Sequence, residues 1–131
     1  MRIYVDTNVY LDYFENRRDR LRPLGEFAFQ LFRRALKCEF EIVMSDFVMG
    51  ELELRQPRER IDMFLEPLRK KGKIRVIHEE PGDIARAHSL SPHWQDALHA
   101  VLAGKAEAEC IVTRNVRDFE GLFKTVLPEN A

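Results

Sequence analysis

The chain has 131 residues, a length at which a single domain covering residues 1–131 is expected. Hydrophobic residues make up 45% and charged residues 33%, a composition that excludes a disordered or fibrous chain. The 21 Lys and Arg residues nearly balance the 22 Asp and Glu residues, so the formal net charge is -1. This balance excludes a protein that coats nucleic acid through bulk positive charge, so any polyanion must be held by a local patch or through a metal ion.

The apolar stretches and the cysteines indicate in which compartment the protein is expected. No stretch is apolar over the ~20 residues that a membrane span needs, and Met1-Arg2 leads into a strand-like run rather than a signal peptide. We therefore expect a soluble, cytoplasmic protein with no membrane partner. Cys38 and Cys110 lack the C-x-x-C spacing of a metal or redox site, so both are predicted to be buried free thiols.

Short β-prone runs alternate with amphipathic helical patterns along the chain. The first run, residues 2–5, ends at Asp6, and Thr7-Asn8 offers capping side chains for a helix over residues 9–14. The clearest helix covers residues 24–36, where apolar residues recur at i, i+3, i+4 and i+7. The remaining expected elements are a strand at 40–44, a helix capped by Ser45, a helix from Pro57 to Gly72, a strand at 73–77, a helix at 83–89, a helix at 93–106, a strand at 110–113, a short helix or turn at 116–123 and a strand at 124–127. This alternation predicts an α/β fold with a mostly parallel, roughly five-stranded sheet covered by helices on both faces.

Acidic and polar residues follow the predicted strands, at the edge of an open α/β sheet where ligands bind. Asp6 directly follows the first strand, Glu51 lies in the helix after the second, and Asp96 lies in the first turns of the long late helix. Asn115 and Asp118 follow the fourth strand. Taken singly, each of these residues could also have a purely structural role as a helix cap, a solvated helix residue or a turn residue. Several carboxylates at one edge repel one another and raise one another's pKa, an arrangement that favours a hard divalent cation such as Mg²⁺ or Mn²⁺.

A family resemblance is carried by the segments Ile3-Tyr4-Val5-Asp6-Thr7-Asn8-Val9-Tyr10-Leu11-Asp12, Met49-Gly50-Glu51-Leu52, Trp94-Gln95-Asp96-Ala97-Leu98-His99-Ala100 and Ile111-Val112-Thr113-Arg114-Asn115-Val116-Arg117-Asp118-Phe119. Their order and spacing over residues 1 to about 127 resemble a PIN-domain ribonuclease. The short length, without an appended zinc module, resembles the VapC-type toxin of a toxin–antitoxin pair. The resemblance implies a PIN-like three-layer sandwich. We expect the first strand to be central and the fourth to lie beside it, because Asp6 and the 113–118 loop must meet at one strand end.

The resemblance also implies roles for the acidic residues. Asp6, Glu51 and Asp96 match the three core metal ligands and catalytic residues of the family. Asn115 stands where the family often has a carboxylate, and Asp118 lies three residues further on. We assign the fourth catalytic and ligand position to Asp118 and keep Asn115 as a further ligand, which leaves open whether one or two ions bind.

Three further polar residues accompany this acidic set. Asn8 and Thr113 match positions that, in the family, orient the metal ligands or the attacking water. The alternative is an ordinary structural role, in which the two side chains stabilise a turn or cap a helix. His99 lies one turn beyond Asp96 on the same helical pattern, where we expect a structural or surface histidine, with contact to the rim of the site as the alternative.

The chemistry that the resemblance implies is endoribonuclease activity. A divalent ion neutralises the charge of an RNA phosphodiester and activates water, and the family leaves 5′-phosphate and 3′-hydroxyl ends. No phosphate-binding glycine motif, H-E-x-x-H zinc motif or recognisable covalent nucleophile motif occurs in the chain. Receiver-type phosphotransfer fits poorly because only Asp6 stands at the first strand end, and a haloacid-dehalogenase-like phosphatase needs an acid where Asn8 stands. A non-catalytic PIN-fold binding module and an RNA-processing nuclease without an antitoxin stay open as alternatives.

Clusters of arginines and of large apolar residues predict the binding partners of the protein. A cluster of arginines after the first helix is predicted to bind RNA, with a solvated turn as the alternative: Arg17, Arg18, Arg20 and Arg22. The resemblance implies a cognate antitoxin that lies across the acidic cleft. The helices over residues 24–36 and 57–68 are rich in large apolar side chains that suit a groove for a partner helix, a homodimer contact or packing within the monomer: Phe27, Phe29, Phe32, Met63, Phe64 and Leu65. We expect the isolated protein to form a homodimer.

Overall fold

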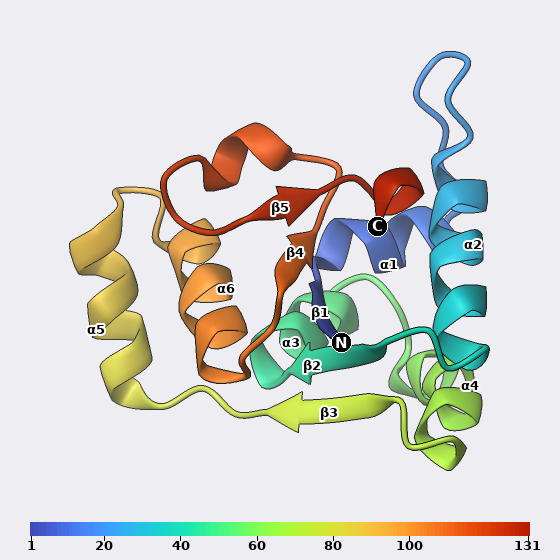
Figure 1. The fold of residues 1–131 in the computed structure, drawn as a ribbon, viewed down its shortest axis with the longest axis horizontal. Coiled ribbons are helices and arrows are strands. Elements are labelled where there is room, and N and C mark those ends of the chain that lie inside the picture. The colour runs from blue at the N-terminus through green and yellow to red at the C-terminus, as the bar shows by residue number, and fades with distance from the viewer.

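The sheet and its strand order define the architecture. The computed structural model describes all of residues 1–131 and contains one five-stranded sheet in the order β3-β2-β1-β4-β5 (Figure 1). Every neighbouring pair of strands is parallel. The strands are β1 (Arg2–Val5), β2 (Glu41–Ser45), β3 (Ile74–Ile77), β4 (Cys110–Val112) and β5 (Thr125–Val126). The predicted α/β fold is confirmed, with the first strand at the centre and the fourth beside it.

Helices cover the sheet. They are α1 (Thr7–Phe14), α2 (Leu24–Leu36), α3 (Asp46–Glu53), α4 (Arg58–Lys70), α5 (Pro81–Leu90) and α6 (Trp94–Lys105), with short 3₁₀ turns η1 (Val116–Phe119) and η2 (Pro128–Asn130). Figure 1 shows α5 beside α6 on one side of the central strands and α1 beside α2 on the other. This arrangement has the layers that the alternation of strands and helices predicts. None of the helices combines the length and apolar character needed to cross a membrane.

The central strand explains how the functional edge is built. Ile3, Tyr4 and Val5 of β1 are each 0% exposed, as expected for a strand covered on both faces. The register places Val5 opposite Val112 of β4, so these two strands end at the same level. The residues that follow them therefore start side by side at one edge of the sheet.

Some element boundaries differ from the sequence prediction. Helix α5 begins at Pro81 rather than at Asp83, because Glu80 and Asp83 form a reciprocal capping box at its start. The segment predicted at 116–123 forms only the 3₁₀ turn η1. The last strand is shorter than predicted and covers Thr125–Val126.

The two thiols have different surroundings. Both cysteines are free, and Cys110 is buried as predicted, but Cys38 is exposed. The prediction of a buried thiol is therefore wrong for Cys38. It lies beyond the end of α2 in a left-handed turn with φ 65°, where the chain reverses toward β2 and the helical periodicity no longer decides which side chains face the core.

Candidate functional site

Asp6 stands at the junction of β1 and α1. Its backbone N–H donates to the Val112 carbonyl at 2.9 Å, which continues the β1–β4 pairing by one residue. Asp6 occupies the N-cap position of α1, yet its side chain makes no capping hydrogen bond. Its Oδ2 instead accepts a hydrogen bond from the Thr113 hydroxyl at 2.9 Å. The simple capping role is thus excluded, and the carboxylate is directed toward the end of β4.

Thr113 is the centre of a small hydrogen-bond cluster. Its side chain is fully buried, and its hydroxyl accepts from the Asn8 side-chain amide at 3.3 Å and from the Asn115 backbone N–H at 3.1 Å. With the donation to Asp6, the hydroxyl connects the start of α1 to the loop after β4. Asn115 thus enters the cluster through its backbone N–H.

Glu51 reaches the same edge from the middle of α3. Its Oε1 accepts from the Thr7 hydroxyl at 2.5 Å and lies 3.1 Å from Nε2 of His99. Burial raises the pKa of the Glu51 carboxyl, but the hydrogen bond and charge of His99 and the hydrogen bond from Thr7 outweigh burial, so the pKa lies below its usual value. Glu51 is therefore present as a carboxylate.

His99 lies between two of the acidic residues. Its Nε2 is 3.6 Å from Oδ1 of Asp6 as well as 3.1 Å from Glu51. Burial lowers the pKa of His99, but the hydrogen bond to Glu51 and the negative charges of Asp6, Glu51 and Asp96 outweigh burial and raise it above its usual value. The histidine is buried, as a structural histidine would be, but it also contacts the acidic cluster itself, beyond the rim contact that sequence reasoning allowed.

Asp96 and Asp118 complete the acidic surroundings. Burial, followed by the negative charges of Asp118 and Asp6, raises the pKa of Asp96. Asp96 and Asp118 also line one pocket of about 690 Å³, together with Ser91, His93 and Arg117 among others. An open, polar space thus adjoins the carboxylates that repel one another.

The donor set suits a divalent cation in kind. Carboxylate oxygens are the ligands that Mg²⁺ and Mn²⁺ prefer. Burial and then the charges of Asp118 and Asp6 raise the pKa of Asp96, and a bound cation would offset both effects. No three His, Cys, Asp or Glu side chains have the mutual spacing of a complete metal site, however. Glu51 in particular is turned toward His99 and Thr7. The structure thus gathers the predicted residues at one edge without closing them around one point.

The predicted RNA-binding arginines separate into two groups. Arg17 forms ion pairs with Glu15 at 2.9 Å and with buried Asp12 at 3.7 Å, and Arg22 pairs with Glu129 at 2.6 Å. Arg18 and Arg20 are exposed and form no ion pair. They lie in the loop between α1 and α2, which projects from the body of the molecule (Figure 1).

An ion pair between Arg114 and the buried carboxylate of Asp12 connects the loop that carries Asn115 and Asp118 to α1. Nε of Arg114 donates to Oδ2 of Asp12 at 2.9 Å, and the Asp12 side chain is only 2% exposed. Burial raises the pKa of Asp12 against the lowering effect of Arg114 and Arg17. Sequence reasoning assigned no role to this pair, although both residues lie inside the segments that carry the family resemblance.

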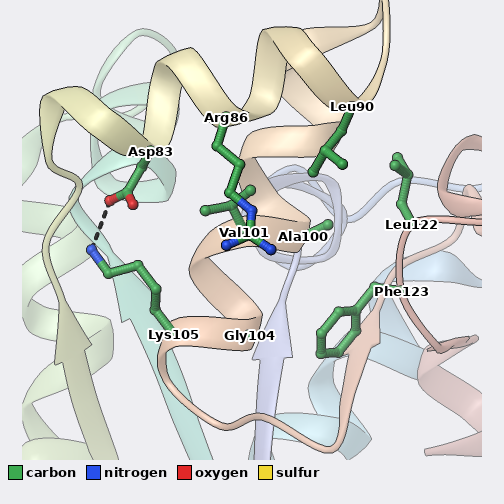
Figure 2. A pocket seen from close by; sticks show the side chains of 9 residues that line it. All are labelled: Asp83, Arg86, Leu90, Ala100, Val101, Gly104, Lys105, Leu122 and Phe123. Carbon is green, nitrogen blue, oxygen red and sulfur yellow. Dashed lines mark hydrogen bonds and ion pairs between the residues drawn. The ribbon is translucent and has the colours of Figure 1, made fainter.

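A separate pocket of about 430 Å³ lies between α5, α6 and the segment before β5 (Figure 2). Leu90, Val101 and Phe123 supply apolar walls, and Figure 2 shows Arg86 extending across it. None of the predicted site residues lines this pocket.

Comparisons with known proteins identify the fold. No family model matches the chain, and no curated protein matches it significantly. The crystal structure of VapBC2 from Rickettsia felis, bound to a DNA fragment from their promoter, contains a chain with TM-score 0.65 and 17% identity, and the match covers 97% of this chain and 98% of that one. The crystal structure of FitAcB from Neisseria gonorrhoeae contains one with TM-score 0.63 and 16% identity, covering 98% and 99%. The chain therefore has the PIN-like fold of these structures, as its sequence predicts.

Proposed function

We propose that the protein is a divalent-metal-dependent endoribonuclease and the toxin of a toxin–antitoxin pair. The observation that carries this proposal is the gathering of acidic side chains at one edge of the sheet: Asp6 directly follows β1, and Asp96 of α6 and Asp118 of η1 line one pocket beside it. The fold shared with chains of the VapBC2 and FitAcB structures supports the biological role, because the sequence resembles a VapC-type toxin. The residues most concerned lie where an open α/β sheet places its ligands.

Each residue has a distinct part in this proposal. Asp6, Asp96 and Asp118 would hold Mg²⁺ or Mn²⁺, joined by Glu51 through the oxygen that His99 and Thr7 leave free. When bound, the ion supplies charge neutralisation at the phosphodiester and a lower pKa for the attacking water. Thr113 holds the Asp6 carboxylate by its hydroxyl.

RNA binding would involve the projecting loop. Arg18 and Arg20 are exposed, and no acidic side chain of the protein neutralises them, so they are available for phosphate contacts. Arg17 and Arg22 are engaged by acidic residues of the same chain, so we exclude them from the proposed contact set.

The proposed antitoxin would cover apolar surface between α2 and α4. Phe29 is 43% exposed and Met63 is 77% exposed, and the Phe29 ring stacks on Tyr13 with centroids 6.5 Å apart. Of the six apolar residues that the sequence singles out, Phe32 and Leu65 are buried in the core and are unavailable to a partner. An amphipathic helix would cover the exposed residues, and a homodimer is the second proposed use of this surface.

The test is RNA cleavage by purified protein with Mg²⁺ or Mn²⁺. We expect cleavage that EDTA abolishes and that Asp6→Asn removes, because the variant lacks a carboxylate at the strand end. Glu66→Gln is the matched control, since Glu66 is exposed on α4 and away from the site. Metal-independent cleavage, or full activity of Asp6→Asn, would refute the proposal.

A non-catalytic binding module is the second candidate. The observation that favours it is the absence of three side chains spaced as a complete metal site. In that case the wild-type protein would bind RNA or a partner protein without cleaving RNA, and Asp6→Asn would bind equally well.

A further inference from the structure

A buried chain of polar side chains runs behind the acidic cluster. The Tyr4 hydroxyl lies 2.8 Å from Oγ of Ser45 and 2.8 Å from Nδ1 of His99, whose Nε2 lies 3.1 Å from Oε1 of Glu51. Tyr4 and Ser45 are 0% exposed and His99 is 3% exposed. These hydrogen-bonded side chains connect β1, the end of β2, α6 and α3. They are polar residues in a part of the core where apolar residues are usual.

The direction of the hydrogen bonds follows from the Glu51 carboxylate, which can only accept, so Nε2 of His99 carries a proton. In the neutral ring Nδ1 is then the acceptor, and the Tyr4 hydroxyl donates to it. Ser45 donates to Tyr4 while its Oγ accepts from the Val48 N–H at 3.0 Å, so every polar group has a partner. The proton of the neutral ring then resides on Nε2, the nitrogen that faces Glu51.

Glu51 is consequently held by one oxygen. The Thr7 hydroxyl donates to Oε1 at 2.5 Å, and Nε2 of His99 lies 3.1 Å from the same oxygen, whereas no hydrogen bond ends on Oε2. The side chain is 33% exposed and Oε2 is not a fully buried atom, so Oε2 is accessible to a ligand. Two donors on one oxygen restrict the rotation of the carboxylate and favour binding through the other oxygen.

We propose that His99 is a positioning residue: held by Tyr4 and Ser45, it fixes Glu51 so that Oε2 alone is presented to the divalent cation. This inference rests on the proposed function. A partner of this kind contributes to metal binding without touching the ion, and its loss typically weakens metal affinity by roughly 10–100-fold. The aromatic rings of Phe47 and Phe119 pack around His99, at centroid distances of 4.8 and 6.4 Å, and hold the imidazole in place.

Mn²⁺ affinity of the RNA-free protein, measured by electron paramagnetic resonance, tests the inference. We expect His99→Leu to bind Mn²⁺ about 10–100-fold more weakly, and His99→Gln, which keeps an N–H donor, to recover most of the affinity. His78→Leu is the matched control, because His78 is exposed after β3 and its one ion pair is with Asp46, which is not among the predicted site residues. Melting curves of each variant establish that it is folded.

The tautomer of His99 provides a second readout that a purely structural histidine would not require. Long-range ¹H–¹⁵N spectra of the neutral ring are expected to show the proton on Nε2, and Tyr4→Phe, which removes the hydroxyl that holds Nδ1, is expected to weaken Mn²⁺ binding. If His99→Leu fails to fold, Tyr4→Phe tests the same series of contacts from Tyr4 through His99 to Glu51, with only one hydroxyl removed.

The outcomes separate the two proposals. A folded His99→Leu or Tyr4→Phe protein that binds Mn²⁺ as tightly as the wild type overturns the positioning role and leaves the proposed function standing. A proton found on Nδ1 also overturns it. Wild-type protein that binds no Mn²⁺ overturns both proposals, and this result is visible before any variant is made.

Discussion

At the scale of single residues, the site is an unfavourable collection of charges. Burial and the charges of Asp118 and Asp6 raise the pKa of Asp96, which means that the ionised form of Asp96 is less favourable in the folded protein than in the unfolded chain. Such a group lowers stability at neutral pH, where it must be ionised. A cost in stability of this kind is typical of residues at functional sites, and it agrees with the proposed role of Asp96 as a ligand.

Asp96→Asn is therefore expected to raise the free energy of unfolding at pH 7 without metal while removing RNA cleavage. The gain arises because the amide carries no charge, which burial disfavours and which Asp118 and Asp6 repel. The loss of a ligand is expected to reduce activity by about 100-fold or more. Urea denaturation in EDTA and a cleavage assay measure the two effects. Wild-type cleavage by this variant contradicts the mechanism.

The fourth ligand position gives a comparison between two neighbours. Asp118→Ala is expected to reduce cleavage more than Asn115→Ala, because the Asp118 charge acts on Asp96 and both line one pocket, whereas Asn115 contributes its backbone N–H. Alanine keeps that N–H. The reverse order of activities would assign the ligand to the Asn115 side chain.

At the scale of elements, polar contacts tie the end of one helix to the start of another. Nζ of Lys105, at the end of α6, lies 2.7 Å from Oδ2 of Asp83 and 3.0 Å from Oε1 of Glu80, at the start of α5 (Figure 2 shows the Asp83 pair). The same Oδ2 accepts the Glu80 backbone N–H at 2.8 Å. One carboxylate therefore caps α5 and anchors α6 against it.

Asp83→Ala is expected to lower the free energy of unfolding at pH 7 by about 1 kcal/mol, the usual cost of a lost cap. Burial raises the pKa of Asp83, but Lys105 and the Glu80 N–H outweigh burial and place the pKa below its usual value. The stabilisation is thus present above the unfolded-state pKa of about 3.9 and is lost as the pH falls through the folded-state pKa. Urea denaturation at pH 7 and in steps below pH 4 would reveal it, and a difference between the proteins that persists in strong acid would exclude this cause.

At the scale of the whole molecule, the proposed function places an acidic edge that cuts RNA and an apolar surface for an antitoxin on one chain. Expression without the proposed antitoxin is expected to slow growth of the host, because RNA cleavage is unchecked. Cells that make equal soluble amounts of the Asp6→Asn protein are expected to grow normally. Equal growth of both strains argues against a toxin and favours an RNA-processing nuclease of narrow specificity.

The sequence by itself determined the parts that depend on local pattern and on order along the chain. Three features were predictable: the strand that contains Ile3–Val5, the long amphipathic α2, and the position of Asp6 and the 113–118 loop at one strand end. They were predictable because the periods of strands and helices can be recognised from neighbouring residues. Once β1 and β4 are neighbours, Asp6 and Thr113 must meet. The boundaries of α5 and η1 were less predictable, since side-chain caps and single turns set them.

Only the tertiary structure decided which polar groups pair across the core. Tyr4 and His99 are 95 residues apart in the sequence. Each lies among apolar residues of its own segment, so the neighbouring sequence does not indicate that the two side chains form a hydrogen bond. The ion pairs of Arg17 and Arg22 and the exposure of Cys38 likewise depend on where loops close against distant elements. The physical reason is that a hydrogen bond or ion pair acts over a few ångströms in space, and separation along the chain carries no information about that distance.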